Sequence, residues 1–188
     1  MQAVNQPLAS YVDQILITQG QIHERVAELG TEIESRHEGG DLTLLVILHG
    51  SILFAADLMR AMSVPVYLES FRVASYHGGT ASSGTVSMEQ AETLRHLKGQ
   101  NVLLVDDILD SGRTLHAVKR LLEEEIEAAT VRSCVLLDKK VTRSMDAAAD
   151  FTGFEIEDAF VIGYGLDYQG KFRNLPFIGT LKPECIES

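Results

Sequence analysis

Short, uninterrupted apolar runs recur along the chain, and each ends abruptly at a turn or at polar residues. The three clearest are LTLLVILHG (42–50), NVLLVDD (101–107) and VRSCVLLD (131–138). A run of this length is too short for a helix of its own, and an apolar residue at nearly every position is typical of a strand covered on both faces. Two further segments, VPVYLESFRVASY (64–76) and AFVIGYG (159–165), complete the predicted strands.

Three segments between these runs have apolar residues at helical spacing. The segment 18–40 opens with Thr18 and Gln21, a capping-box pattern, and ends at two glycines. The other two cover 51–62 and 114–126. The spaced positions are Ile22, Val26, Leu29 and Ile33; Leu53, Ala56, Met59 and Arg60; and Leu115, Val118, Leu122 and Ile126. Strands alternating with helices predict an α/β fold with a mostly parallel sheet flanked by helices.

Charge and cysteine content narrow the possible partners. The net charge of −11 and the pI of about 4.9 argue against nucleic acid or an anionic membrane as the main partner. The first residues, MQAVNQPLASYVDQ, show no export signal, and no run approaches the ~20 apolar residues of a membrane span. Cys134 and Cys185 match no zinc or redox spacing. We therefore expect a cytoplasmic protein with reduced thiols and a buried Cys134.

Polar clusters follow the predicted strands at the same end of each. They are His49-Gly50, Asp106-Asp107, Asp138-Lys139 and Gly165-Leu166-Asp167. Parallel α/β sheets bind ligands beyond the carboxyl ends of their strands. We therefore expect these clusters to share one site.

The most informative cluster is LLVDDILDSGRTL (103–115), where a strand gives way to a helix. Gly112 lets the backbone approach a ligand, and a helix N-terminus with nearby hydroxyl groups suits a phosphate. The aspartates before it would repel phosphate, so they suit hydroxyl donors such as those of a ribose. A plain strand end with Asp110 as helix N-cap is the simpler alternative. The complete string favours a site for a phosphorylated pentose.

This string resembles the signature of the type I phosphoribosyltransferase family, in which two acids and two apolar residues precede Asp-[Ser/Thr]-Gly-x-Thr. Three further segments resemble the hypoxanthine-guanine branch of that family: SYHGGTASSG, LLDKKVTRS and the stretch from FTGFEIEDAF to FIGTL. The resemblance implies one domain over 1–188, with a core at about 40–165 and a small hood built from about 1–20 and 166–188.

Members of this family transfer the phosphoribosyl group of 5-phosphoribosyl 1-diphosphate (PRPP) to a free base with Mg²⁺ and release pyrophosphate. The resemblance implies that Asp106 and Asp107 hold the ribose hydroxyls directly or through Mg²⁺, and that Asp110 is the general acid/base at purine N7. It also implies that Asp167 is a ligand of Mg²⁺ on the pyrophosphate side. The PRPP contacts it implies are His49, Gly50, Asp106, Asp107, Asp110, Ser111, Gly112, Arg113, Thr114 and Arg173.

The purine contacts implied by the resemblance are Lys139, Phe160, Val161 and Asp167. Lys139 would donate to a 6-oxo group, Phe160 would stack on the base, and the backbone of Val161 would read position 2. An ammonium facing the 6-amino group of adenine would be left unpaired, so we expect 6-oxopurines to be preferred. From composition alone, Lys139 is a solvated residue after a strand and Phe160 a core aromatic.

Two further segments are expected at the edge of the site. Ser75 and Tyr76 begin a Gly/Ser-rich segment that resembles the catalytic lid of the family, although its composition also fits an ordinary surface loop. Leu48-His49-Gly50-Ser51 replaces the Leu-Lys-Gly-Gly turn of many relatives, a turn that often follows a cis peptide. Since histidine is only partly charged near neutral pH, we expect weaker or more pH-dependent pyrophosphate binding.

The main hypothesis is a purine salvage enzyme that makes IMP or GMP from hypoxanthine or guanine, with xanthine as a further candidate base. A PRPP-sensing regulator on the same fold is the alternative, although such regulators tend to lack the full catalytic set or to carry an added DNA-binding domain, and here the loop aspartate and the lid motif are both present. A phosphoacceptor receiver also pairs adjacent aspartates with a later lysine, but it needs no Ser-Gly phosphate turn. The family resemblance further implies a homodimer or homotetramer.

Overall fold

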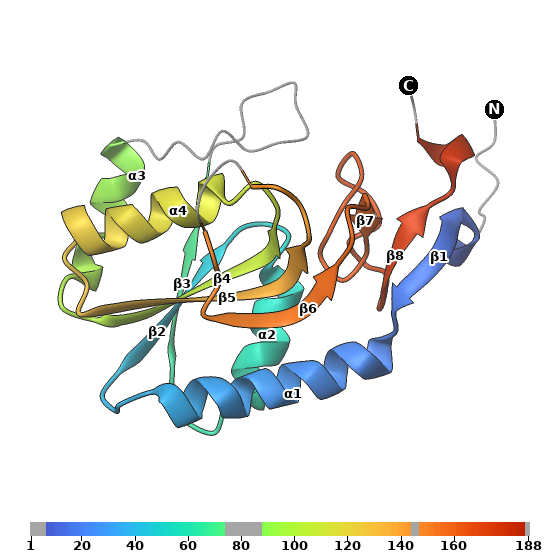
Figure 1. Ribbon diagram of the computed structural model, residues 1–188. Helices are drawn as coiled ribbons and strands as arrows, with labels where there is room; N and C mark the ends of the chain where they lie inside the picture. Colours follow the sequence, from blue (N-terminus) through green and yellow to red (C-terminus); the bar gives the residue numbers. More distant parts are fainter. Residues whose placement is uncertain (1–6, 74–87, 144–146, 187–188) are drawn as a thin grey trace.

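A five-stranded parallel sheet forms the centre of the computed structural model, which describes residues 7–73, 88–143 and 147–186 (Figure 1). The strand order is β3-β2-β4-β5-β6, and every neighbouring pair is parallel. The strands are β2 (Leu42–Ile47), β3 (Tyr67–Phe71), β4 (Asn101–Leu109), β5 (Thr130–Lys139) and β6 (Phe151–Ile156). The predicted α/β fold with a parallel sheet flanked by helices is confirmed.

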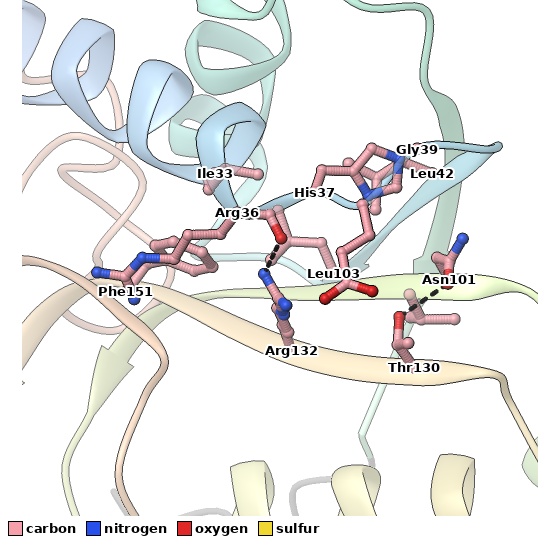
Figure 2. Close-up of a pocket in the computed structure, with 12 residues that line it drawn as sticks. Ile33, Arg36, His37, Gly39, Leu42, Asn101, Leu103, Thr130, Arg132 and Phe151 are labelled. Carbon is pink, nitrogen blue, oxygen red and sulfur yellow. Dashed lines mark hydrogen bonds between the residues drawn. The ribbon is translucent and has the colours of Figure 1, made fainter.

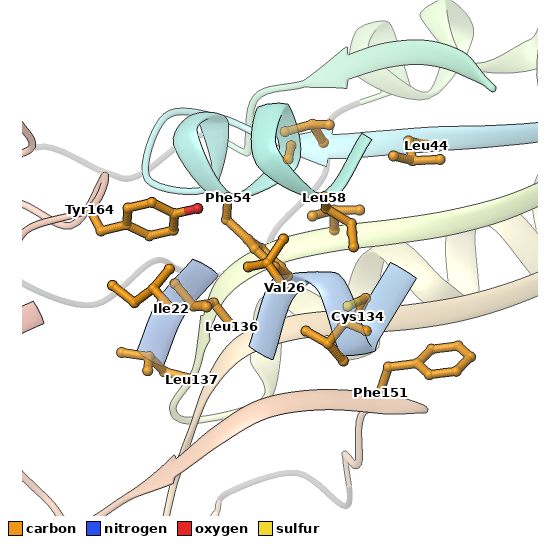
Figure 3. Close-up of a cluster of buried hydrophobic side chains, with 14 of the residues drawn as sticks. Ile22, Val26, Leu44, Phe54, Leu58, Cys134, Leu136, Leu137, Phe151 and Tyr164 are labelled. Carbon is orange, nitrogen blue, oxygen red and sulfur yellow. The ribbon is translucent and has the colours of Figure 1, made fainter. Parts of the chain in front are cut away.

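Helices cover both faces of this sheet. On one face lie α1 (Gln19–Arg36) and α2 (Ile52–Ala61), whose apolar side chains pack on Leu44 and Leu136 (Figure 3). On the other lies α4 (Arg113–Arg120), which continues as a π-helical turn at Leu121–Glu125. Before β4 come α3 (Met88–Thr93) and a 3-10 turn at Arg95–Leu97. A sheet covered on both faces explains why β2 is buried at every position.

The helix α1 follows the sequence prediction closely. Thr18 is its N-cap: the Thr18 hydroxyl accepts from the Gln21 amide at 3.3 Å, and the Gln21 side chain accepts from the Thr18 amide at 2.9 Å. The predicted positions Ile22, Val26, Leu29 and Ile33 are all buried. Cys134 lies in the same cluster (Figure 3), and burial raises the pKa of its thiol, which agrees with the predicted core role.

The buried face of α2 differs from the prediction. Phe54, Ala55 and Leu58 face the core, whereas Leu53, one of the positions chosen from the spacing, is exposed. The segment ILFAADLMRA is apolar around most of its circumference, so spacing alone does not identify the buried side. The four apolar positions predicted for 114–126 are all buried, as expected.

A second, three-stranded antiparallel sheet lies beside the first. It has the order β1-β8-β7 and joins β1 (Val12–Ile17), β8 (Ile178–Leu181) and β7 (Val161–Ile162). Short 3-10 turns, Leu8–Tyr11 and Pro183–Cys185, flank it. The two ends of the described chain therefore lie close together (Figure 1). The boundaries of core and hood given above stay a prediction.

Two strand predictions near the C-terminus need correction. AFVIGYG does not join the parallel sheet, because Val161–Ile162 pairs with β8 in the small one. The fifth parallel strand is instead β6, which was not predicted. Gly153 lets β6 pack tightly: a Cβ there would lie 2.5 Å from the carbonyl oxygen of Leu136. A search of the described residues finds no helix long and apolar enough to cross a membrane.

Candidate active site

A cavity of about 350 Å³ opens at the carboxyl ends of β2 and β4. The turn after β2, the start of α4 and the segment after β7 also contribute to its wall. Nine residues predicted to contact PRPP line it: His49, Gly50, Asp106, Asp107, Asp110, Ser111, Gly112, Thr114 and Arg173. Asp167, predicted as a metal ligand, lines it as well, whereas Arg113 does not. Three of the four polar clusters therefore line one cavity, whereas Asp138-Lys139 does not, and the shared binding site stays a prediction.

Three segments of the cavity wall meet at Gly50: the turn after β2, the end of β4 at Asp107 and the segment after β7 at Gly165. A Cβ on Gly50 would lie 1.5 Å from Oδ2 of Asp107, so the carboxyl group occupies the space that any side chain would need. From the other side, a Cβ on Gly165 would lie 1.9 Å from the carbonyl oxygen of Gly50, and Gly165 has a φ of +101°. Sequence reasoning placed Gly165 in a cluster but did not foresee this contact. The peptide between Leu48 and His49 is cis.

Asp106 and Asp107 form a pair of neighbouring carboxyl groups, of which Asp106 is buried and Asp107 half-buried. Burial raises the pKa of Asp106 well above its ordinary value, and the neighbouring Asp107 raises it further. Burial also raises the pKa of Asp107, although hydrogen bonds from Asp106 and the Ile108 amide and the charge of Arg173 oppose that rise. A cation or hydroxyl donors at this position would stabilise the ionised pair.

The segment 110–114 forms a turn that leads into α4. Gly112 has a φ of +79° and precedes the first helical residue, so it takes the left-handed conformation that glycine adopts without strain. The amide of Arg113 donates to the Ser111 hydroxyl at 3.5 Å. The cavity therefore faces the N-terminus of a helix, where backbone amides and the helix dipole favour an anion.

Lys139 lies at the end of β5 and reaches toward this turn. Its ammonium is 3.6 Å from Oδ2 of Asp110 and 3.3 Å from Oδ1 of Asp158. Arg143 supports the arrangement, because its guanidinium donates to the carbonyl oxygens of Asp110 at 3.3 Å and Lys139 at 3.1 Å and pairs with Asp138. Asp158 was not among the predicted site residues.

The two other predicted purine contacts follow β6. Phe160 is 43% exposed, so its ring is not a core aromatic, and its edge contacts Tyr168 at a centroid distance of 5.7 Å. Val161 is buried in β7. Neither residue lines the cavity described above. Their part in base binding stays a prediction.

Asp167 and Arg173 form an ion pair at 2.7 Å on the rim. Arg173 also donates to the carbonyl oxygen of Gly165 at 2.6 Å, and the Gly170 amide donates to Asp167 at 2.6 Å. Within the described ranges, no three His, Cys, Asp or Glu side chains are placed to hold a metal by themselves. Ser75 and Tyr76, predicted to open the lid, lie outside the described residues.

A smaller cavity of about 110 Å³ lies at the opposite, amino end of the strands (Figure 2). Its basic residues have structural partners. Arg132 donates to the carbonyl oxygen of Arg36 at the end of α1, and the Arg36 guanidinium lies 5.0 Å from the ring centre of Phe151. Since α1 points its C-terminal carbonyl groups toward this cavity, the helix dipole disfavours an anion there. We assign these arginines to helix capping and packing.

Comparison with known proteins settles the family. The profile of the phosphoribosyl transferase domain matches residues 14–169. The chain belongs to the phosphoribosyltransferase family. It is 41% identical to the hypoxanthine-guanine phosphoribosyltransferase of Streptococcus pneumoniae over 177 residues, which cover 94% of this chain and 97% of that protein. The enzyme of the same name from Bacillus subtilis is 38% identical over 178 residues, with the same coverage of both chains.

Solved structures agree with this assignment to the phosphoribosyltransferases. The crystal structure of a hypoxanthine phosphoribosyltransferase from Staphylococcus aureus superimposes with a TM-score of 0.86 at 34% identity, covering 99% of this chain and all of that one. The solved structure of a point mutant of the hypoxanthine phosphoribosyltransferase from Trypanosoma cruzi gives 0.81 at 35% identity, covering 93% of this chain and 98% of that one. These similar proteins are named as enzymes, and none of these comparisons supports the alternative of a PRPP-sensing regulator.

Proposed function

We propose that this phosphoribosyltransferase transfers the 5-phosphoribosyl group of PRPP to a 6-oxopurine. Hypoxanthine and guanine are the expected bases, with xanthine as a further candidate, and the products are IMP or GMP and pyrophosphate. The names of the similar proteins support this assignment, and so do the residues that line the cavity at the carboxyl ends of the strands. In this reading the protein is an enzyme of purine salvage.

The distance of 3.6 Å between the Lys139 ammonium and the Asp110 carboxyl group is the observation that carries the choice of base. A 6-oxopurine presents O6 and N7 side by side on one edge. A donor and a proton acceptor at this spacing match that edge, with Lys139 at O6 and Asp110 at the N7 proton. Adenine has an amino group in place of O6, so Lys139 would face a second donor. Such mismatches can lower kcat/KM by roughly 10⁴–10⁵.

The remaining residues have roles that follow from their positions. The turn 110–114 and the N-terminus of α4 hold the 5′-phosphate, and Asp106 and Asp107 accept from the ribose hydroxyls. As the bond from C1′ to pyrophosphate breaks and the bond from C1′ to N9 forms, Asp110 takes the proton from N7. A positioned general base of this type contributes about 10²–10⁴-fold. Arg173 contacts the pyrophosphate, and Ser75 and Tyr76 open a lid that excludes water.

The residues present fit the Mg²⁺ ion that the family resemblance implies. Mg²⁺ binds proteins through one or two carboxylates and completes its shell with water and substrate phosphates, so a cluster of three protein ligands is not needed. Asp106 and Asp107 would hold it from the ribose side, and Asp167 from the pyrophosphate side. The raised pKa of Asp106 supports this role, because a bound cation would favour its ionised form. When bound, Mg²⁺ neutralises charge on the leaving pyrophosphate.

We further propose that the chain forms a homodimer or homotetramer. Tyr67 and Leu68 on the edge strand β3 and Ile52 and Leu53 at the start of α2 are apolar and exposed, and exposed apolar groups favour association. Size-exclusion chromatography with light scattering tests this: a monomer at micromolar concentration would contradict it. Both cysteines are free thiols, which supports the cytoplasmic location predicted from the sequence.

The deciding experiment measures pyrophosphate release from PRPP and Mg²⁺ with each of four bases. We expect turnover with hypoxanthine and guanine, a measurable rate with xanthine, and none above background with adenine. The Asp110→Asn variant, which keeps the shape of the side chain but removes the base, is the matched control and should lose about 10²–10⁴-fold in kcat. Strong activity with adenine, or none with any 6-oxopurine, would overturn the assignment.

A further inference from the structure

Lys139 is shared between two carboxyl groups that come from different parts of the chain. Its side chain is only 11% exposed, whereas that of Asp158 is 73% exposed and that of Asp110 57%. The ammonium therefore lies between the carboxyl group of Asp110, the proposed proton acceptor, and that of Asp158, which has no role in the proposed reaction.

The parallel register of β5 and β6 places Asp158 at this spot. Lys139 lies opposite Ile156, the last residue of β6, and the Lys140 amide donates to the Ile156 carbonyl oxygen at 2.8 Å. The chain then leaves the sheet, and Asp158, two residues on, returns its carboxylate to the ammonium at 3.3 Å. The contact between Asp158 and Lys139 is thus set by the register of β5 and β6 at the ends of these strands.

We propose that Asp158 is a positioning residue for base recognition: it holds the Lys139 ammonium at the place of purine O6 when Asp110 is drawn to N7. The inference rests on the proposed function, since it assigns Lys139 and Asp110 to neighbouring atoms of the base. Asp158 itself touches neither substrate. It acts through Lys139 alone.

Asp110 and Asp158 compete for one cation, the Lys139 ammonium. If the ammonium is pulled close onto Asp110, the carboxylate oxygen that should accept from N7 is already engaged in the ion pair. A second carboxylate on the far side of Lys139 offsets that pull and keeps the ammonium from moving fully onto Asp110. Without Asp158, Lys139 has Asp110 as its only carboxylate partner within 4 Å among the described residues. Base binding and proton transfer should then both weaken.

The chain contains a matched control in the next residue. Lys140 pairs with Glu155 at 3.1 Å, so a second lysine and a second acid form an ion pair across the same two strands. Both side chains of that pair are more than half exposed, and neither lines the cavity. A loss of negative charge at Glu155 therefore reports any general electrostatic effect without disturbing Lys139.

The experiment compares Asp158→Asn, Asp158→Glu and Glu155→Gln by steady-state kinetics with hypoxanthine and PRPP varied separately. For Asp158→Asn we expect kcat/KM for hypoxanthine to fall about fivefold, the upper range for an ion pair with one exposed partner. The KM for PRPP should stay within twofold of the wild type, because the phosphate and ribose contacts are untouched. Asp158→Glu should restore most of the loss, and Glu155→Gln should behave as wild type.

Three outcomes would overturn the proposal. An unchanged kcat/KM for hypoxanthine in Asp158→Asn removes its basis, and an equal loss toward PRPP indicates a general structural effect. A matching loss in Glu155→Gln indicates overall charge. Thermal unfolding of each variant checks that the exposed substitutions leave the fold intact. If the wild type transfers to no 6-oxopurine, the proposed function itself fails, whereas an active wild type with an unaffected Asp158→Asn variant rejects only this inference.

Discussion

The contact between Gly50 and Asp107 allows a sharp test of how the cavity is held in shape. In Gly50→Ala, the new Cβ would lie 1.5 Å from Oδ2 and 2.5 Å from Cγ of Asp107, whereas ordinary contacts begin at 3.4 Å. The carboxyl oxygen must therefore retreat by about 1.9 Å. Since a misplacement of ~1 Å can lower the rate by ~10²-fold, we expect kcat/KM for PRPP to fall at least 100-fold.

The expected effect on stability is smaller than that on activity. A single added methyl group in a packed site costs about 1–3 kcal/mol, which is roughly 2–10 °C in Tm for a domain of this size. Gly20→Ala is the matched control, because no atom lies within 4 Å of its Cβ position and Gly20 is inside α1. That variant should be at least as stable as the wild type and keep full activity.

Steady-state kinetics with PRPP varied and thermal unfolding by circular dichroism give both quantities. Should Gly50→Ala be too unstable to assay, Asp107→Asn removes the charge while Gly50 is retained, and it should lose comparable activity. A folded Gly50→Ala variant within threefold of wild-type kcat/KM would refute the reasoning, because the position of the Asp107 carboxyl group would then not matter for catalysis.

Three further predictions concern single ionisable side chains of the candidate site. Lys139→Gln should lower the preference for hypoxanthine over adenine, measured as the ratio of kcat/KM, by at least ~10²-fold, because an amide can accept as well as donate; an unchanged ratio would count against the role of Lys139. Because the pKa of Asp106 is raised in the folded protein, the fold loses stability as pH rises from the ordinary carboxyl pKa toward the raised one, so Asp106→Asn should raise Tm at pH 8 more than at pH 5 while abolishing activity. In His49→Lys, the affinity for PRPP should vary less between pH 6 and 8 than in the wild type; equal pH dependence would argue that backbone amides alone bind the ligand.

Much of the fold could be predicted because its local signals agree with the tertiary structure. The capping box at Thr18 and the apolar spacing after it fix α1, and the uninterrupted apolar run of β2 indicates burial on both faces. The buried side of α2 could not be chosen, since Leu53 and Phe54 are equally apolar. The strand β6 was missed because Gly153 interrupts its pattern and its tight packing on Leu136 appears only in the folded chain.

The residues of the candidate site were likewise only partly predictable from the sequence. Residues 106–114 lie on one continuous segment, so the pattern of acids, hydroxyls and glycine could be recognised from the sequence alone. Asp158 and Gly165 belong to the site through contacts with residues far away in the chain, Lys139 and Gly50. A register between two strands and a close approach between two turns determine those contacts. Neither leaves a signal in the local sequence.

The charge balance of the cavity leads to a last prediction. Among the described residues that line it are four aspartates, Asp106, Asp107, Asp110 and Asp167, against one guanidinium, Arg173, and the imidazole of His49. Arg173 is already paired with Asp167. Such a wall repels the several negative charges of PRPP, in a protein whose net charge is −11.

Binding of PRPP should therefore depend steeply on a divalent cation that neutralises charge on both the wall and the ligand. We expect the apparent KM for PRPP to fall at least tenfold, equivalent to about 1.4 kcal/mol, as Mg²⁺ rises from micromolar to millimolar concentration. Excess chelator should abolish turnover, and added Mg²⁺ should restore it. Asp106→Asn, with one wall charge removed, should show a shallower dependence of PRPP binding on Mg²⁺ in a direct binding assay. Equal dependence in the two proteins would show that the cation neutralises the ligand alone, and that the aspartate pair takes no part in holding it.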